Sequence, residues 1–322
     1  MSAERFDDLT VRSAWLYHQR GWTQEQIARK FRVSRATVAR ALQRAIQDGL
    51  VRVVFAAEPE RMMQLEENLC EGYGLQEAVV VPSGTDSTCR QTALARAVAS
   101  YLERALEDKM VVSLGTSRTL HEMTGIFSSS RRLPNCVFVE MLGGIASEDP
   151  RFDIYNVSWR LAESCGGSAR HLFTPAVLGS VQAKEVMLQD TRVAQTLQLA
   201  AESDLSLLAI GDTGINCPVF RMAHFDEEDI SELQSRGAVG EIIGRAYDLN
   251  GNPVTTKIED RILGLDLSQI DRLRFVVAVA GGKEREQAVA GALRQGFVKV
   301  LITDSDIAEG LVSEVSTTEQ VV

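Results

Sequence analysis

Short apolar runs alternate with helix-like patterns along most of this chain, and this alternation restricts its fold more than any other feature. Strands separated by helices form parallel sheets that carry helices on both faces. The pattern therefore predicts an α/β domain with a doubly wound parallel sheet, whose ligands bind at the carboxyl ends of the strands. The candidate strands are Glu77–Pro82, Met110–Leu114, Cys136–Met141, Ala169–Phe173, Asp204–Ile210, Phe275–Ala280 and Val298–Ile302.

The chain has 322 residues, which is long enough for two domains. We assign residues 1–56 to an N-terminal domain, 57–74 to a helical linker and 75–322 to the α/β domain. In the linker, Met62, Leu65 and Leu69 follow one another at helical spacing on a charged background, which predicts an amphipathic helix. Two interpretations stay open at this point: the apolar stripe packs on its own domain, or it pairs with its copy in another subunit.

The net charge of −10 is unevenly distributed. Residues 1–55 hold 10 Lys/Arg against 5 Asp/Glu, whereas the other 267 residues hold 24 against 39. A small basic module can bind a polyanion, and a large acidic body is repelled by one. This asymmetry favours a nucleic-acid-binding module at the N-terminus.

The sequence gives no support for a membrane protein or a metal-binding protein. The longest apolar run, Phe275–Gly282, has eight residues, whereas a membrane-spanning helix needs about 20. Acidic Asp7 and Asp8 precede Arg12, so no secretory leader can be drawn. The five cysteines are scattered, without a Cys-x-x-Cys pair or a neighbouring His cluster. We expect a cytoplasmic chain with no membrane partner, no metal and no cofactor.

Two short helices are predicted to meet across a tight turn in the basic module. Thr23 and Gln26 have the spacing of a capping box, which starts a first helix. Ser34 is a second N-cap, and its helix carries the apolar positions Val38, Ala41, Leu42 and Ala45. A helix from about Phe6 to Arg20 should precede this pair, and Gly49–Phe55 has the composition of a strand that follows it.

Cations gather on the second of these helices. Thr37, Arg40 and Arg44 lie away from its apolar stripe, and Arg35 occupies its first turn, where a recognition helix enters the major groove. Between Val11 and Arg52 there are nine Lys/Arg and only two acidic residues. The pattern predicts binding to double-stranded DNA, and a helical module that binds protein is the alternative.

Three loops after predicted strands carry polar chemistry. Gly115–Thr119 is a hydroxyl-rich turn before a helix, which suits an anion. In Gly281-Gly282-Lys283, the two glycines let a ligand approach the backbone closely, and Lys283 supplies a mobile cation. In the third loop, Asp212 lies beside glycines, and its carboxylate can accept hydrogen bonds from hydroxyl groups. Each loop taken alone is also compatible with an ordinary tight turn.

The sequence resembles the SorC family of bacterial sugar-responsive regulators. In the N-terminal module the resemblance rests on Thr23-Gln24-x-x-Ile27-Ala28, Val33-Ser34-Arg35-x-Thr37-Val38-x-Arg40 and Ala45-x-x-x-Gly49-Leu50-Val51. In the α/β domain it rests on Ser113-x-Gly115-Thr-Ser-Arg-Thr119-Leu120, Gly211-Asp-x-Gly214, Gly237-Ala-Val-Gly240-Glu-Ile-x-Gly244-Arg245, Ala280-Gly-Gly-Lys283 and Leu301-Ile-Thr-Asp304.

This resemblance implies a helix-turn-helix domain followed by an effector domain with a fold like that of sugar-phosphate isomerases. It implies that Gly115, Thr116, Ser117, Arg118 and Thr119 hold the phosphate of a phosphorylated sugar or related polyol. It further implies that Glu241 takes a sugar hydroxyl and that Lys283 helps to close the site, with Gly282 and Asp212 beside them. Many members have a second glycine in the phosphate loop, where this chain has Thr116, Ser117 and the bulky Arg118.

The resulting hypothesis is a ligand-controlled transcription factor rather than an enzyme. The candidate DNA-binding residues are Gln24, Ser34, Arg35, Thr37, Arg40 and Arg44. Because one such module is small, tight operator binding should require a dimer, or the tetramer that the resemblance implies. The alternative is an isomerase-like enzyme in which Lys283 works with Glu241 or Asp212. The histidines His18, His121, His171 and His224 lie in unrelated segments and identify no base.

Overall fold

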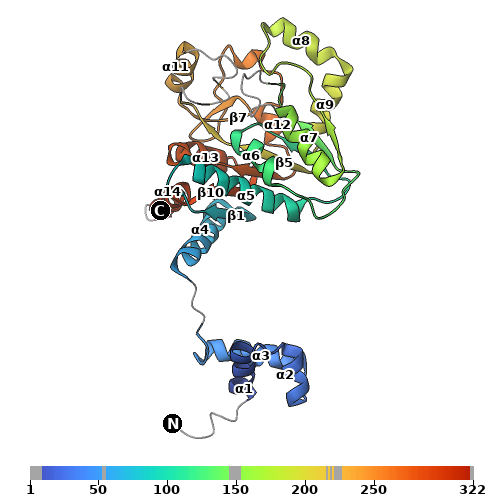
Figure 1. The fold of residues 1–322 in the computed structure, drawn as a ribbon. Helices are drawn as coiled ribbons and strands as arrows, with labels where there is room; N and C mark the ends of the chain where they lie inside the picture. Colours follow the sequence, from blue (N-terminus) through green and yellow to red (C-terminus); the bar gives the residue numbers. More distant parts are fainter. Residues whose placement is uncertain are drawn as a thin grey trace. The chain divides into compact units, whose positions relative to one another are not determined.

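The computed structural model describes residues 9–52, 56–144, 154–214 and 227–319, together with Cys217 and Phe220. By its internal contacts the chain divides into two compact units, residues 1–60 and 61–322. Figure 1 shows the helices of the first unit and the sheet and helices of the second.

The N-terminal unit contains three helices, α1 (Leu9–Arg20), α2 (Gln24–Phe31) and α3 (Arg35–Gln47). Thr23 and Gln26 form the predicted capping box, in which each side chain bonds the other residue's backbone N–H. Ser34 Oγ accepts a hydrogen bond of 3.1 Å from the backbone N–H of Thr37 and so starts α3. The helix-turn-helix predicted from these caps is confirmed.

Apolar side chains from all three helices close a small core in this unit. Its members are Ala14, Leu16, Ile27, Ala28, Val38, Leu42 and Ala45. The strand expected at Gly49–Phe55 is a partial error, because residues 49–52 form turn and coil. Residues 53–55 of that prediction lie outside the described part, as do residues 6–8 of the predicted first helix. Without a neighbouring strand in the ladder, β-branched composition does not produce strand structure at 49–52.

Helix α4 (Ala57–Tyr73) carries the predicted apolar stripe. Met62, Leu65 and Leu69 are buried in the core of the second unit, together with residues of its sheet. The stripe therefore packs on its own chain, which answers the question that the sequence pattern left open.

The second unit is built on a seven-stranded parallel sheet. Its strands are β1 (Glu77–Val81), β2 (Val111–Leu114), β3 (Val137–Glu140), β4 (Ser168–Arg170), β5 (Leu205–Ala209), β9 (Val276–Val279) and β10 (Val298–Asp304). All seven predicted strands occur in this sheet, although β4 covers only residues 169 and 170 of the predicted Ala169–Phe173, and they lie in the order β1-β10-β9-β5-β2-β3-β4. From β2 the chain winds toward β3 and β4 on one side, and then from β5 toward β9 and β10 on the other. The strand order thus reverses between β2 and β5.

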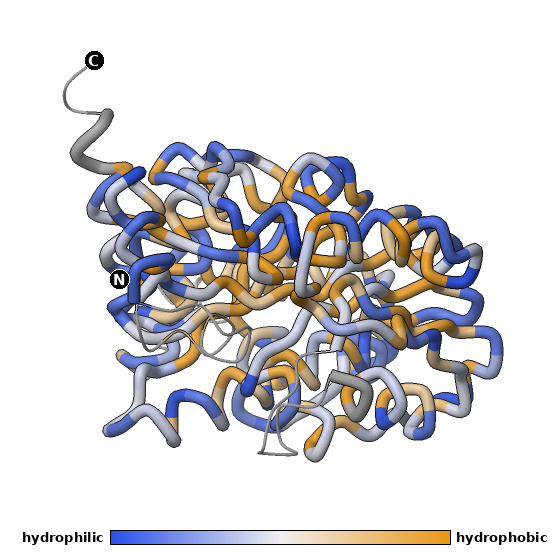
Figure 2. Tube along the Cα trace, turned by 90° about the horizontal axis from the view of Figure 1, so that it is seen from above, coloured by the Kyte–Doolittle hydropathy of each residue, from blue (hydrophilic) through white to orange (hydrophobic). Residues whose placement is uncertain are grey.

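Helices cover both faces of this sheet (Figure 1). One core cluster joins the sheet to α5 (Ser87–Ala105), α6 (Arg118–Ile126) and α7 (Ile154–Cys165), and the other joins it to α4, α13 (Glu286–Arg294) and α14 (Ser305–Glu319). Alternate residues of β9 supply the two clusters: Val277 and Val279 lie in one, Val276 and Ala278 in the other. In Figure 2, hydrophobic segments run through the middle of the fold.

The remaining elements include a small antiparallel sheet that the sequence pattern did not reveal. It consists of β6 (Gly211–Asp212), β7 (Ala238–Ile242) and β8 (Arg245–Asp248) in that order. The other helices are α8 (Val181–Gln189), α9 (Thr191–Ala201), α11 (Glu227–Ser235) and α12 (Leu267–Ile270). Among the described residues, no helix combines the length and apolar character that a membrane span requires.

Truncating the buried stripe of α4 should destabilise the second unit. Leu69 is fully buried, so Leu69→Ala should lower the free energy of unfolding by about 2–5 kcal/mol through lost burial and a residual cavity. Met63 on the same helix is 51% exposed, so Met63→Ala should change it by less than about 0.5 kcal/mol. Urea unfolding of both variants measures the difference, and equal effects would contradict the packing described for α4.

Candidate functional site

A cavity of about 700 Å³ opens where the strand order reverses. Its floor is formed by residues at the carboxyl ends of β5 and β9, namely Ala209–Gly211 and Val279–Gly281. Its walls come from α5, from the loop and helix that follow β2, and from Arg160 on α7. In doubly wound sheets this crevice is the usual ligand site, because the crossover helices diverge from it.

The loop after β2 presents hydrogen-bond donors to the cavity. Thr116, Ser117, Arg118 and Thr119 all line it. Ser117 is the N-cap of α6, and its Oγ accepts a hydrogen bond of 3.1 Å from the backbone N–H of Leu120. Gly115 lies behind the loop, where its N–H bonds Leu207 O at 2.8 Å. The first N–H groups of a helix attract anions, so this loop is suited to a phosphate or carboxylate.

Glu241 on β7 contributes a buried carboxyl group to the same cavity. It is only 3% exposed, and its Oε2 accepts a hydrogen bond of 2.8 Å from the N–H of Gly244. Desolvation by burial is the largest effect on its ionisation and raises the pKa of Glu241 to about 7. The hydrogen bond from Gly244 and the charge of Arg285 oppose this rise in pKa, whereas the charge of Asp212 adds to it.

The backbone around Glu241 is shaped to hold this side chain. Gly211 lies opposite Glu241 in the β6–β7 ladder, and a β-carbon at Gly211 would overlap Glu241 Oε1. Ile243 and Gly244 both have positive φ, 47° and 80°, as in the tight two-residue turn of a hairpin. A β-branched residue is strained there. A β-carbon at Gly115 would lie 3.2 Å from Ile243 Cγ2, so the hairpin approaches the loop after β2 closely at this glycine.

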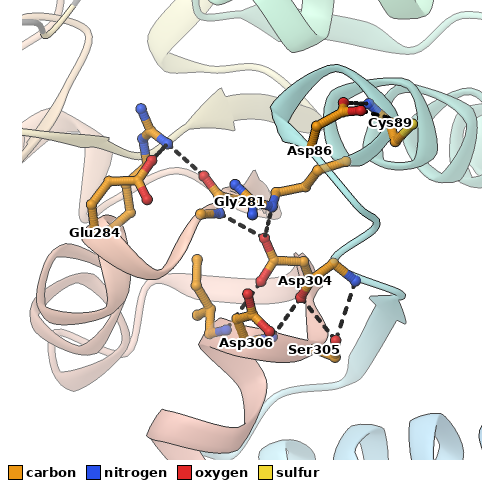
Figure 3. A network of polar contacts seen from close by, with 12 residues as sticks. Asp86, Cys89, Gly281, Glu284, Asp304, Ser305 and Asp306 are labelled. Atoms are coloured by element: carbon orange, nitrogen blue, oxygen red, sulfur yellow. Dashed lines mark hydrogen bonds and ion pairs between the residues drawn. The ribbon is translucent and has the colours of Figure 1, made fainter.

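Arg285, in the short 3₁₀ turn that follows β9, lies between two carboxylates. Its Nη2 lies 3.3 Å from Asp212 Oδ2, its Nη1 lies 2.7 Å from Glu284 Oε1, and Nη1 also donates to the carbonyl of Gly281. Figure 3 shows Gly281 and Glu284 in this network. The guanidinium is thus fixed in the cavity wall by its acidic neighbours.

Asp304 anchors the floor beside Arg285. This fully buried carboxylate accepts hydrogen bonds from the N–H of Gly282, at 2.6 Å, and of Ile307, at 3.0 Å. Arg90 from α5 places its Nε 3.1 Å from Asp304 Oδ2, an ion pair that joins α5 to the end of β10 (Figure 3). Removing one partner of such a buried pair leaves an uncompensated charge.

The structure brings together part of the predicted effector set. Thr116, Ser117, Arg118, Thr119 and Glu241 share the cavity wall. Gly115 and Gly282 are buried backbone positions outside that lining, and Asp212 is engaged with Arg285. Lys283 is exposed and is not part of the lining, whereas Arg285, two residues later, is. Sequence reasoning did not identify Arg285, Arg90, Gln91, His121 and Arg160, which also line the cavity.

The predicted DNA-binding residues lie on or beside α3. Arg35, Arg40 and Arg44 are exposed on that helix. Gln24 on α2 accepts a hydrogen bond of 3.4 Å from Arg35 Nε, and Ser34 Oγ lies 2.8 Å from Thr37 Oγ1. Arg44 forms an exposed ion pair of 3.3 Å with Asp48. Arg40 donates only to the carbonyl of Ala36, at 3.4 Å, so its charge is not neutralised by an acidic residue of the described chain.

The buried Glu241 should make folding stability depend on pH. Its folded-state pKa, about 7, exceeds the ordinary value of 4.5, so between these values the folded chain holds a proton that the unfolded chain has released. The free energy of unfolding should then fall as the pH rises through this window, by up to about 1.4 kcal/mol per pH unit. Glu241→Gln should remove that slope, and the exposed Glu163→Gln should keep it, in urea unfolding from pH 5 to 8. A slope that Glu241→Gln leaves unchanged would contradict the burial described.

Comparisons with known proteins agree with this architecture. Residues 57–313 match the model of a sugar-binding domain family, Sugar-bind, and residues 14–62 match a model of the MarR family. The chain is 29% identical to the deoxyribonucleoside regulator of Bacillus subtilis over 309 residues, 95% of this chain and 97% of that protein. It is 25% identical to the sorbitol operon regulator of Klebsiella pneumoniae over 310 residues, 95% and 98% of the two chains.

Solved structures show the same fold. The full-length sorbitol operon regulator SorC from Klebsiella pneumoniae has a TM-score of 0.74 at 24% identity, over 97% of this chain and 99% of that one. The sugar-binding domain of a transcriptional repressor from Vibrio fischeri has a TM-score of 0.71 at 25% identity, over 79% and 99%. With its helix-turn-helix domain ahead of a sugar-binding domain, the chain belongs to the SorC family of transcriptional regulators.

Proposed function

We propose that this chain regulates transcription of carbohydrate-metabolism genes, and that a sugar phosphate or a related sugar or polyol in the cavity controls its binding to operator DNA. The observation that carries the proposal is the cavity at the β2–β5 reversal, where an amide-rich loop faces a buried carboxyl in a chain that also has a helix-turn-helix. Amide groups and cations suit an anionic group, and Glu241 suits hydroxyls.

Control of DNA binding requires that the effector favour one arrangement of the chain over another. The close approach of Ile243 to Gly115 gives the cavity a route for such a preference, because it brings the Glu241 hairpin near the loop after β2. We further propose that the protein acts as a dimer or tetramer, since one small module reads only a short DNA sequence and a symmetric operator needs at least two.

The site is proposed to sense its ligand rather than to convert it. Lys283, the residue that an isomerase-like reaction would use, is exposed and lies outside the cavity lining. The relatives identified above are named as regulators. A binding site without turnover fits both observations.

The cation face of α3 should carry sequence-specific DNA binding. Arg40→Ala should weaken operator binding by about 1–3 kcal/mol, because it removes an exposed guanidinium without touching the core of the unit. Arg192→Ala removes an exposed arginine from α9 and should leave operator affinity unchanged. Gel-shift titration measures both, and equal affinity of the Arg40 variant and the wild type would refute the assignment.

One calorimetric experiment can distinguish a sensing role from a catalytic role. A panel of phosphorylated and free sugars and polyols should yield at least one compound that binds saturably and is recovered unchanged after overnight incubation. Chromatographic detection of a product from that compound would overturn the sensing role in favour of an enzyme.

A further inference from the structure

A single carboxylate at the floor of the cavity joins three elements of the second unit. Asp304, the last residue of β10, is fully buried. Its Oδ2 accepts the N–H of Gly282 at 2.6 Å and lies 3.1 Å from Arg90 Nε of α5, while its Oδ1 accepts the N–H of Ile307 at 3.0 Å. Because Ile307 lies in the first turn of α14, Asp304 fixes the start of this helix as an N-cap does (Figure 3).

The pairing of Arg90 with Asp304 is incomplete. Arg90 lines the cavity, and its side chain is 21% exposed. Its buried Nε lies 3.1 Å from Asp304 Oδ2 but makes no hydrogen bond to any residue that the structure describes. A hydrogen bond weakens steeply when the N–H points away from the acceptor, so the attraction between the two charges holds the guanidinium here. A ligand in the cavity can therefore draw Arg90 away without breaking a directional bond.

The loop after β1 provides a second hold on the first turn of α14. Ser83 Oγ accepts a hydrogen bond of 3.0 Å from the N–H of Asp306 and lies 2.9 Å from Ser305 Oγ. The N–H of Ser83 also donates to Ser305 Oγ, at 3.2 Å. These bonds do not involve Arg90, so we expect α14 to shift about this fixed point, rather than to detach, when Arg90 moves.

Helix α14 is attached to α4 near both ends of α4. Close to the start of α4, Arg61 forms an ion pair with Glu309 of α14. At the last residue of α4, Tyr73 Oη lies 3.3 Å from Leu311 O and 3.3 Å from Glu314 Oε2. A shift of α14 therefore acts on α4 at two separate points.

Helix α4 is also the covalent connection to the first unit. It runs without a break from Ala57 to Tyr73, and Arg61 is the first residue of the second unit. Residues 57–60 of the same helix belong to the first unit. A change in how α14 holds Arg61 thus acts on the chain where it leaves the second unit.

From these contacts we propose that Asp304 is the switch through which the cavity controls α4. A ligand that draws the Arg90 guanidinium away from Asp304 shifts the first turn of α14, and the Arg61 and Tyr73 contacts pass this shift to α4. The inference rests on the proposed function and specifies how the cavity and the helix-turn-helix are coupled. Arg90 and Asp304 are positioning residues in this account.

The charge balance at Asp304 gives the switch two states. With Arg90 in place, a guanidinium and two backbone N–H groups compensate the buried carboxylate. Without Arg90, only the N–H groups of Gly282 and Ile307 remain, and a buried charge that has lost its partner is costly. Closely packed elements change between discrete arrangements rather than continuously. A two-state element that both sites bias is what coupling between them requires.

Hydrogen–deuterium exchange on the full chain tests this route without effector or DNA. Arg90→Gln removes the charge that faces Asp304. Amide exchange should then accelerate by at least about tenfold at residues 306–311 of α14 and about threefold at residues 61–69 of α4, because losing the partner of a buried charge destabilises what that charge holds. Arg96→Gln changes an exposed arginine of the same helix, outside the cavity lining, and should leave both segments unchanged.

Faster exchange in α14 with wild-type exchange in α4 would overturn the proposal. Equal acceleration in α7 would also overturn it, because that result reports a loss of global stability. Should Arg90→Gln not fold, Asp304→Asn replaces it, since it removes the same attraction from the other side. Faster exchange of Asp304→Asn in α14 and α4 but not in α7 would support the route, and unchanged exchange in α4 would overturn it.

Operator titrations separate this route from the proposed function. The double variant Arg61→Gln, Tyr73→Phe breaks the contacts between α4 and α14 and leaves the cavity lining intact. A sugar or polyol that changes operator affinity by the same factor in this variant and in the wild type overturns the route and leaves the proposed function standing. If exchange spreads to α4 in Arg90→Gln but no sugar or polyol alters operator affinity, the route is supported and the proposed function is refuted.

Discussion

Parallel pairing of β2 with β5 is the constraint on which the site depends. Their register aligns Val112 with Leu205 and Leu114 with Leu207, so both strands end at the same edge of the sheet. Because the chain leaves them in opposite directions, the crossover helices in the described part of the chain diverge from the space above their ends. The loop Thr116–Thr119 and the segment Ala209–Gly211 therefore face one another across an open crevice.

The crevice becomes a selective site through the small sheet β6–β7–β8. This sheet continues directly from β5, and the pairing of β7 with β6 places Glu241 opposite Gly211. Burial disfavours a negative charge on Glu241 and so raises the pKa of this carboxyl group. Beside it, Arg285 and Asp212 form an ion pair. One side of the cavity thus holds a buried carboxyl beside an ion pair.

Sequence patterns predicted those elements whose signal is local. The seven strands of the large sheet were predictable because strands buried on both faces read as continuous apolar runs, as in Val276–Val279. The caps Thr23, Ser34 and Ser117 act within their own turns, so spacing alone located the first two. By contrast, β6 has two residues and β7 contains Gly240 and Glu241, so these strands exist only through the tertiary ladder they form.

The positively charged residues of the cavity could not all be predicted either, because local spacing does not decide which of them reach it. Lys283 and Arg285 both follow the Gly281–Gly282 turn, and only the short 3₁₀ turn at Lys283–Arg285 decides which of them reaches the cavity. Arg90 and Arg160 occupy helices where an arginine ordinarily faces solvent, so no spacing distinguishes them.

The central claim is that the cavity and the helix-turn-helix are energetically coupled. Coupling is reciprocal, so the factor by which an effector changes operator affinity must equal the factor by which operator DNA changes effector affinity. Calorimetric titration of the full chain with the compound it binds, with and without saturating operator DNA, measures this directly. A change in effector affinity that equals the change in operator affinity is the predicted result, and an effector affinity that operator DNA leaves unchanged would contradict the claim.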